Sequence, residues 1–276
     1  MRRRLQKFSV NLSQRKFFGN GGIRGDNLRV LLTNDDGIGS RHLWALAEAL
    51  KLGGHDVTVA APFNQQSGMA HALSVLREVE YKRFDADCEA WAFDGTPTDC
   101  VKIFLEGMAT ETFDALISGI NDGANLATDV IYSGTVGAAL EGFLHAIPSL
   151  AVSIDKASTI PVDAAAQATV DYLEKILRTA DAPFLHNVNF PKNFRGSVPK
   201  FVSTHLGQRD YVNAFTSRTD EAGRTFFHIG GTAVDLNDAE GTDIHAVNSG
   251  LVSVTPLHAD AADHDAVARL QKIFRG

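Results

Sequence analysis

The chain has 276 residues, of which 44% are hydrophobic and 21% charged, and its formal net charge is -7. A chain of this size and composition can bury a sizeable core as one large or two small domains, which excludes a disordered or fibrous protein. Its apolar stretches are of strand length, well short of the roughly 20 residues that a membrane-spanning helix needs, so no membrane partner is expected.

The distribution of charge bears on whether the protein binds nucleic acid, and the cysteine content bears on its cellular compartment. Residues 1–27 carry seven basic side chains and one acidic one, leaving 19 basic against 32 acidic residues, a net charge of -13, for the rest. An acidic body argues against a nucleic-acid partner. We interpret the basic leader as a disordered extension or a start-site artefact rather than a nucleic-acid arm or transit peptide. Two cysteines are too few for a disulfide framework and indicate the cytoplasm.

From residue 29 onward, short β-branched runs alternate with amphipathic helices. Residues 29–34, RVLLTN, have the pattern of a buried strand, and Ser40 is placed to cap the helix that follows. Thr96 and Pro97 open another helix that runs to about Met108. Further strands are predicted at residues 55–62, 113–119, 148–154 and 184–190, and further helices at residues 136–143 and 166–177. This alternation predicts a doubly wound, mostly parallel α/β sheet.

Two regions break the alternation. Residues 70–94 and about 199–256 are rich in glycine, threonine and aromatic residues, and we interpret them as hairpins or arms. The chain is therefore expected to form one α/β domain over residues 28–276. Its C-terminal part, about 199–276, is a β-rich region in which exchange between identical chains could bury apolar segments.

Asp35 and Asp36 follow directly after the first predicted strand. In doubly wound folds ligands bind at the carboxyl ends of the strands, and two adjacent carboxylates there repel each other unless something compensates. A hard divalent cation such as Mg²⁺, Mn²⁺ or Ca²⁺ is the simplest compensation. The competing interpretation is a solvated turn at Asp36 and Gly37.

Polar loops follow two other predicted strands. One reads APFNQQSGMAH, and the other reads SGINDGANLATDVIYSGTVGAALEG and opens straight into a helix. Small residues let the backbone approach a ligand, and free N–H groups at a helix start favour phosphate. Ser133 and Thr135 also serve as ordinary helix caps. The acidic pair and the N–H groups together favour a metal and phosphate site.

These segments, with LLTNDDGI, GTPTDCV, GTDIHAV and GLVSVTPL, resemble the SurE family of stationary-phase survival proteins over residues 29–257. The resemblance implies a metal-dependent nucleoside monophosphate phosphatase with a Rossmann-like core, exchanged hairpin or tail elements and a homodimeric or homotetrameric assembly. It also implies one Mg²⁺ or Mn²⁺ per subunit. The implied metal ligands are Asp35, Asp36, Ser67 and Asn121.

The expected reaction is hydrolysis of nucleoside 5′-monophosphates, or else 3′-monophosphates, by a metal-bound water held by Asp35 and Asp36. The residues expected to orient the phosphate are Asn34, Ser133, Gly134 and Thr135. For Asn34, a strand-end hydrogen bond to the backbone is an equal alternative. Other open functions are a nucleotide-sensing module without turnover and a phosphatase with an aspartyl nucleophile.

Three further features bear on the site. The ten histidines show no zinc spacing and are interpreted as structural or surface residues. Residues 39–42, Gly-Ser-Arg-His, replace the proline and glycine usual in the family. Asp122 follows Asn121 where many members have histidine, so pH and metal preferences are not carried over.

Overall fold

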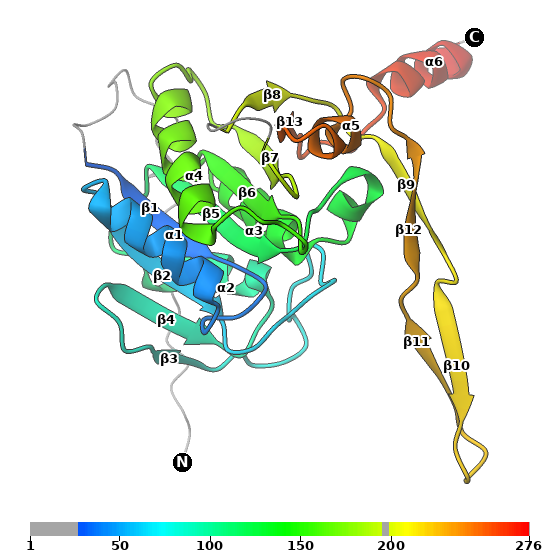
Figure 1. Cartoon of the computed structure of the whole chain (residues 1–276), viewed down its shortest axis with the longest axis horizontal. Coiled ribbons are helices and arrows are strands. Elements are labelled where there is room, and N and C mark those ends of the chain that lie inside the picture. The colour runs from blue at the N-terminus through cyan, green and yellow to red at the C-terminus, as the bar shows by residue number, and fades with distance from the viewer. Residues whose placement is uncertain (1–26, 195–198, 276) are drawn as a thin grey trace.

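The protein is described by a computed structural model that covers residues 27–194 and 199–275, so the predicted basic leader lies outside the described residues apart from Asn27. A nine-stranded sheet runs through the centre in the order β3-β4-β2-β1-β5-β6-β7-β13-β8 (Figure 1). Its strands are β1 (Arg29–Thr33), β2 (Asp56–Pro62), β3 (Tyr81–Arg83), β4 (Glu89–Phe93), β5 (Ala115–Asp122), β6 (Ser149–Ile154), β7 (Leu185–Phe190), β8 (Phe201–Ser203) and β13 (Val252–Pro256). The strands that sequence pattern predicted all lie in this sheet.

The sheet reverses its direction of growth at β1. The chain passes from β1 to β2 on one side and later returns to β5 on the other, and both strands pair with β1 in parallel. Leu32 is thus the register partner of Val59 on β2 and of Ile117 on β5. The carboxyl ends of β1 and β5 form the topological switch point, where this class of sheet binds ligands.

Helices cover both faces of the sheet, giving three layers (Figure 1). Leu43, Leu46 and Leu173 of α1 and α4 belong to the apolar core on one face. Cys100, Phe104 and Val136 of α2, η2 and α3 belong to the core on the other. The helices are α1 (Arg41–Leu52), α2 (Pro97–Ile103), the π-helix η2 (Phe104–Met108), the 3₁₀-helix η3 (Ala127–Ile131), α3 (Gly134–Leu144), α4 (Val162–Leu177), α5 (Asp243–Asn248) and α6 (His264–Arg275). Among the described residues, no helix is both long and apolar enough to cross a membrane.

Two predicted helix caps have different outcomes. Thr96 caps α2 with a full capping box, since its side chain accepts from the Asp99 N–H while the Asp99 carboxylate accepts from the Thr96 N–H. Ser40 stands at the N-cap position of α1, but its side chain makes no capping hydrogen bond there. The Ser40 N–H donates to the Gly37 carbonyl at 3.0 Å, in the turn that leads into the helix.

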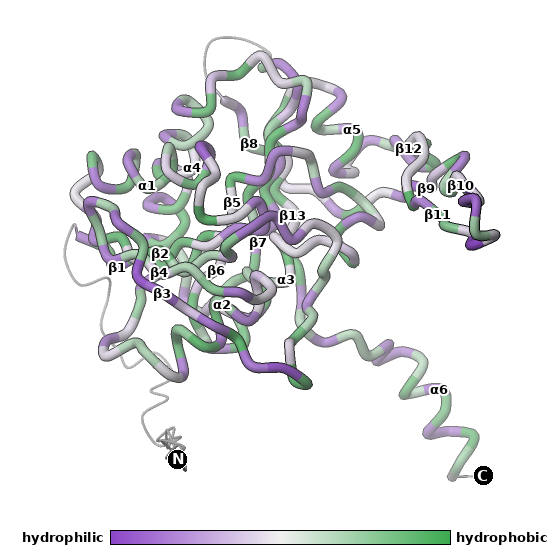
Figure 2. The backbone as a smooth tube through the Cα atoms, turned by 90° about the horizontal axis from the view of Figure 1, so that it is seen from below, coloured by the Kyte–Doolittle hydropathy of each residue, from purple (hydrophilic) through white to green (hydrophobic). Residues whose placement is uncertain are grey.

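The C-terminal region is divided between the sheet and an arm. The segments FVSTHLG and GLVSVTPL contribute β8 and β13 to the central sheet, where β13 runs antiparallel to β7, so they do not leave the core. Between them, two antiparallel pairs form a long arm that extends away from the body (Figure 1). The arm strands are β9 (Gln208–Val212), β10 (Phe215–Thr219), β11 (Thr225–Ile229) and β12 (Thr232–Asn237). Helix α6 projects separately from the body (Figure 2).

Candidate active site

Asp35 lies at the end of β1 with its side chain turned into the protein. Only 4% of the residue is exposed, and its carboxylate accepts a hydrogen bond from the Thr135 hydroxyl at 2.7 Å. Burial raises the pKa of Asp35 to about 6, and the charge of Asp36 adds to the increase while the Thr135 hydroxyl opposes it. A carboxylate with so unfavourable a charge is typical of a functional site.

Asp36 is more open and joins three loops. Its Oδ2 accepts from the Asp122 backbone N–H at 3.1 Å, and its Oδ1 lies 3.4 Å from the side-chain nitrogen of Gln65. The same nitrogen donates to the Ser67 hydroxyl at 3.0 Å. The loops after β1 and β2 and the end of β5 therefore meet at Asp36, which brings the first loop together with Ser67.

Asn121 lies in a bulged part of β5. The register between β5 and β6 shifts between Ser118 and Asn121, and a bulge of this kind re-aims the side chains that follow it. The Asn121 side-chain nitrogen donates to the Gly123 carbonyl at 2.7 Å. Its amide oxygen is therefore the atom left to meet a ligand.

Buried polar atoms without partners gather at the same strand ends. Thr33 on β1 and Ser118 on β5 are register partners, and each is fully buried. Their hydroxyls and the Asn34 Oδ1 have no hydrogen-bond partner among the described residues. Because an unpaired buried polar atom costs about 1–3 kcal/mol, such a concentration is typical of a ligand site rather than of a core. The Asn34 side-chain nitrogen donates to the Gly37 carbonyl at 3.0 Å, which is the backbone alternative considered for this residue.

The start of α3 packs directly on Asp35. The Ser133 hydroxyl caps the helix by accepting from the Val136 N–H at 3.1 Å. A Cβ atom at Gly134 would lie 3.1 Å from the Asp35 Cβ and 3.3 Å from the Gln66 carbonyl oxygen. Glycine therefore lets the positive end of the helix dipole approach the acidic loop closely.

A buried glutamate holds the loop that carries Ser67. The Glu141 carboxylate on α3 pairs with the His71 Nε2 at 2.8 Å, and Lys102 pairs with its other oxygen at 3.2 Å. Burial alone would raise the pKa of Glu141, but the hydrogen bonds from His71 and Lys102 outweigh it and the pKa is lowered. The loop is pressed against α3 at Gly137, where an added Cβ would lie 2.2 Å from the Ala70 carbonyl oxygen.

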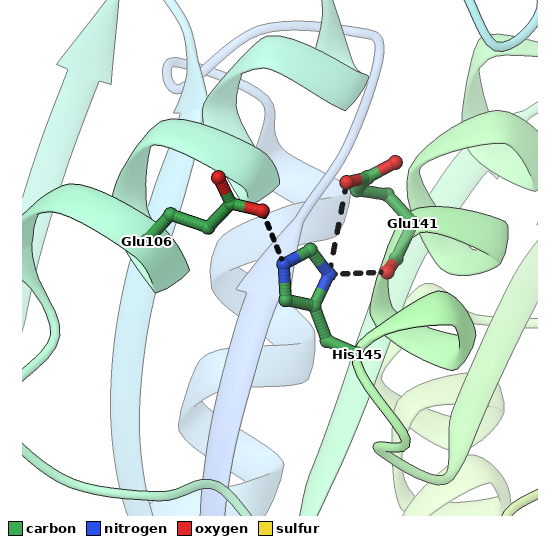
Figure 3. Close-up of side chains that lie close together, drawn as sticks. All are labelled: Glu106, Glu141 and His145. Atoms are coloured by element: carbon green, nitrogen blue, oxygen red, sulfur yellow. Dashed lines mark hydrogen bonds and ion pairs between the residues drawn. The ribbon is translucent and has the colours of Figure 1, made fainter. Parts of the chain in front are cut away.

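Glu141 also belongs to a group whose donor atoms are close enough to hold a metal ion. His145 lies between Glu106 and Glu141, with its Nε2 3.0 Å from Glu106 and its Nδ1 3.6 Å from Glu141 (Figure 3). The Lys102 ammonium already pairs with both carboxylates, at 2.8 Å and 3.2 Å. We interpret this group as an ion-pair network between η2 and α3, because its negative charge is already compensated.

The structure joins most of the predicted site residues through direct contacts. Hydrogen bonds and close packing connect Asp35 with Gly134 and Thr135, and Asp36 with the loops of Ser67 and Asn121. Sequence analysis missed Gln65 and the pair of His71 with Glu141. Gln65 could have been predicted, because it stands in the polar loop that carries Ser67. His71 and Glu141 are 70 positions apart in the sequence, and no local pattern connects them.

The chain is similar to known proteins along most of its length. A family described as "Survival protein SurE" matches residues 30–213. The 5′-nucleotidase SurE of Heliobacterium modesticaldum is 40% identical over 257 residues, covering 90% of this chain and 93% of its own. The 5′-nucleotidase SurE of Xanthomonas oryzae pv. oryzae is 40% identical over 245 residues, covering 87% of this chain and 93% of its own.

A solved structure extends the similarity to the fold. The crystal structure of the SurE protein from Aquifex aeolicus superposes with a TM-score of 0.75 at 35% identity. The match covers 89% of this chain and 99% of that one. Sequence and fold agree, and this chain belongs to the SurE family.

Proposed function

We propose that the chain is a metal-dependent 5′-nucleotidase that hydrolyses nucleoside 5′-monophosphates to nucleoside and phosphate. Its relatives are 5′-nucleotidases by name and match along most of their length. The observation that carries the proposal is the contact between a group that suits a cation and a helix end that suits an anion. The Asp35 carboxylate, which suits a cation, is bonded to Thr135 in the first turn of α3, and the N-terminus of that helix suits a phosphate.

The cation would be held by the carboxylates of Asp35 and Asp36, the Ser67 hydroxyl and the Asn121 amide oxygen. These are hard oxygen donors, which favour Mg²⁺ or Mn²⁺. Two observations support the fit: the pKa of Asp35 is raised, and the Asn34 Oδ1 has no hydrogen-bond partner among the residues that the structure describes. Both groups gain from positive charge nearby. One such ion per subunit would neutralise substrate charge and make an attacking water more acidic.

The phosphate would lie against the backbone N–H groups of Ser133, Gly134 and Thr135. Backbone N–H groups in the first turn of a helix have no acceptor within the helix, so they can bind an anion without rearrangement when charge develops on the phosphate oxygens. Asn34 donates to the Gly37 carbonyl, so we assign it first to shaping the loop of Asp35 and Asp36. Its predicted contact with phosphate would require the amide to leave Gly37.

The first test is phosphate release from AMP with Mn²⁺ or Mg²⁺, with and without EDTA. Asp36→Asn should lower kcat/KM by at least about two orders of magnitude, because it removes one of only two negative ligands. Asp122→Asn is the matched control. It removes the same charge nearby, yet Asp122 contacts Asp36 through its backbone N–H.

Three results would contradict the proposal. Turnover that is unaffected by EDTA would remove the cation from the mechanism. A phosphorylated aspartate trapped during AMP turnover would favour the aspartyl-nucleophile alternative, and nucleotide binding without phosphate release would favour the sensing module.

The proposal also covers the oligomeric state of the enzyme and its cellular compartment. We propose a homodimer or homotetramer, because the arm and α6 expose apolar side chains such as Phe227 and Phe274. We place the enzyme in the cytoplasm, where thiols such as Cys88 and Cys100, both unpaired in the structure, stay reduced.

A further inference from the structure

Two apolar side chains are exposed beside the proposed phosphate site. Tyr132 is 66% exposed and directly precedes Ser133, the N-cap of α3. Met69, 39% exposed, stands two residues after Ser67. The Ala70 N–H donates to the Tyr132 carbonyl at 3.0 Å, so the two segments run side by side. Large apolar side chains at the mouth of a polar site call for a ligand that is partly apolar.

Tyr132 and its neighbour Ile131 differ in their relation to a groove on the surface. Ile131 and Ser133 both line this groove of about 720 Å³, which extends past Leu140 to Leu257. Tyr132 is not among the described residues that line this groove. It stands at the junction of η3 and α3, next to the backbone N–H groups that would hold the phosphate.

We propose that Tyr132, with Met69 beside it, is the surface on which the nucleobase of the substrate stacks. The inference rests on the proposed function, since it places the rest of the nucleotide once the phosphate lies at Ser133 and Gly134. An aromatic ring stacks on any base because every base has a π-face. The enzyme would thus prefer nucleotides over sugar phosphates while discriminating weakly among bases.

The test compares AMP with ribose 5-phosphate, which carries the same phosphate ester without a base. Tyr132→Ala should raise KM for AMP roughly tenfold to a hundredfold, the loss expected for one base–aromatic stack. KM for ribose 5-phosphate should stay unchanged. Tyr132→Phe should keep the wild-type preference, and Ile131→Ala is the control for loss of a neighbouring exposed apolar side chain.

Inhibition by adenosine gives a second measurement, independent of the reacting phosphate. Its inhibition constant against ribose 5-phosphate hydrolysis should rise in Tyr132→Ala and stay unchanged in Ile131→Ala. Light scattering on each variant shows whether Tyr132 is instead buried between copies of the chain.

Three outcomes would overturn the inference. A wild type with equal kcat/KM for AMP and ribose 5-phosphate would refute base stacking while leaving the phosphatase function standing. Equal losses on both substrates in Tyr132→Ala, with a changed molecular mass, would assign the ring to a subunit contact. A wild type that releases phosphate from neither compound would refute the proposed function as well.

Discussion

Asp35 is the residue whose surroundings conflict most with its charge. It is buried, lies beside a second carboxylate and has a pKa raised to about 6 by that burial. In the metal-free protein the folded state therefore favours the protonated carboxyl. Below about pH 4 the Asp35 carboxyl is protonated in both the folded and the unfolded protein, so it does not lower the free energy of unfolding. As pH rises through about 6, the carboxyl must ionise in its buried position, and the free energy of unfolding falls. A bound cation would remove this penalty.

Asp35→Asn should accordingly stabilise the metal-free protein at neutral and higher pH. The Thr135 hydroxyl can still donate to the amide oxygen, and the amide does not ionise. At pH 8 with EDTA we expect the variant to exceed wild type by about 2–3 kcal/mol in free energy of unfolding, with the two converging near pH 4. Urea unfolding at several pH values measures this difference.

Added metal should reverse the order of stability of Asp35→Asn and wild type in the same experiment. Mn²⁺ should stabilise the wild type and leave Asp35→Asn nearly unchanged, because a ligand stabilises only a state that binds it. The variant should also lack nucleotidase activity. A variant less stable than wild type at pH 8 in EDTA would show that the Asp35 charge is already compensated within the chain.

At the level of elements, the loop between β2 and β3 is held from two sides. Glu141 of α3 pairs with His71, and the capping residues of α2 hold the segment that follows. The Thr96 hydroxyl donates to the Ala72 carbonyl at 2.7 Å, and the Asp99 carboxylate accepts from the Ser74 N–H at 2.9 Å. The position of Ser67 therefore depends on two helices that contribute none of the proposed metal ligands.

His71→Ala should loosen this loop and raise the Mn²⁺ concentration for half-maximal activity. Loss of groups that orient metal ligands typically costs about tenfold in affinity, and we expect a rise of that order. His145→Ala is the matched control, because it also removes a partner of Glu141 but does not touch the loop. Equal rises in the two variants would mean that Glu141 acts through stability alone.

Gly137→Ala tests the packing of the same loop on α3. The added methyl would lie 2.2 Å from the Ala70 carbonyl oxygen, so the loop backbone must move. We expect a loss of about 1–3 kcal/mol in free energy of unfolding, together with reduced activity. At Gly107 an added Cβ meets nothing within 4 Å, so Gly107→Ala should keep wild-type stability and activity. Thermal unfolding and phosphate-release assays measure the two properties. Equal effects of the two substitutions would contradict this account.

The success and failure of sequence analysis follow from the distances that its signals span. Strand and helix periodicity is local, and it located β1, β5 and hence the switch point where Asp35 and Asp36 lie. It did not place β13 in the sheet, because pairing with β7 depends on contacts some 65 residues apart, such as Val254 with Val188. The hydroxyls of Thr33 and Ser118, which have no hydrogen-bond partner within the described part of the chain, could not be foreseen for the same reason, since only the sheet register brings them together.

On the scale of the whole molecule, apolar surface is concentrated on two projections. The arm exposes Phe215, Phe227 and Ile229 by 63%, 72% and 77%. Helix α6 exposes Leu270 and Phe274, and it stands apart from the body as the arm does (Figure 2). Neither projection covers this apolar surface with its own chain, and burial between identical chains is a low-cost solution.

We therefore predict at least a dimer in solution, with α6 as one contact. Leu270→Asp should shift the assembly toward smaller species, because Leu270 belongs to an apolar stripe with Val267, Ile273 and Phe274, 43%, 69% and 80% exposed. Gln271→Asp introduces the same charge at the neighbouring position and should leave the mass unchanged. Truncation after Asp260 should weaken assembly as Leu270→Asp does. Mn²⁺ affinity should stay near wild type, because the proposed ligands lie on β5 and in the loops that follow β1 and β2. Light scattering and Mn²⁺ titration measure these effects, and a fully active wild-type monomer at micromolar concentration would show that α6 is not a subunit contact.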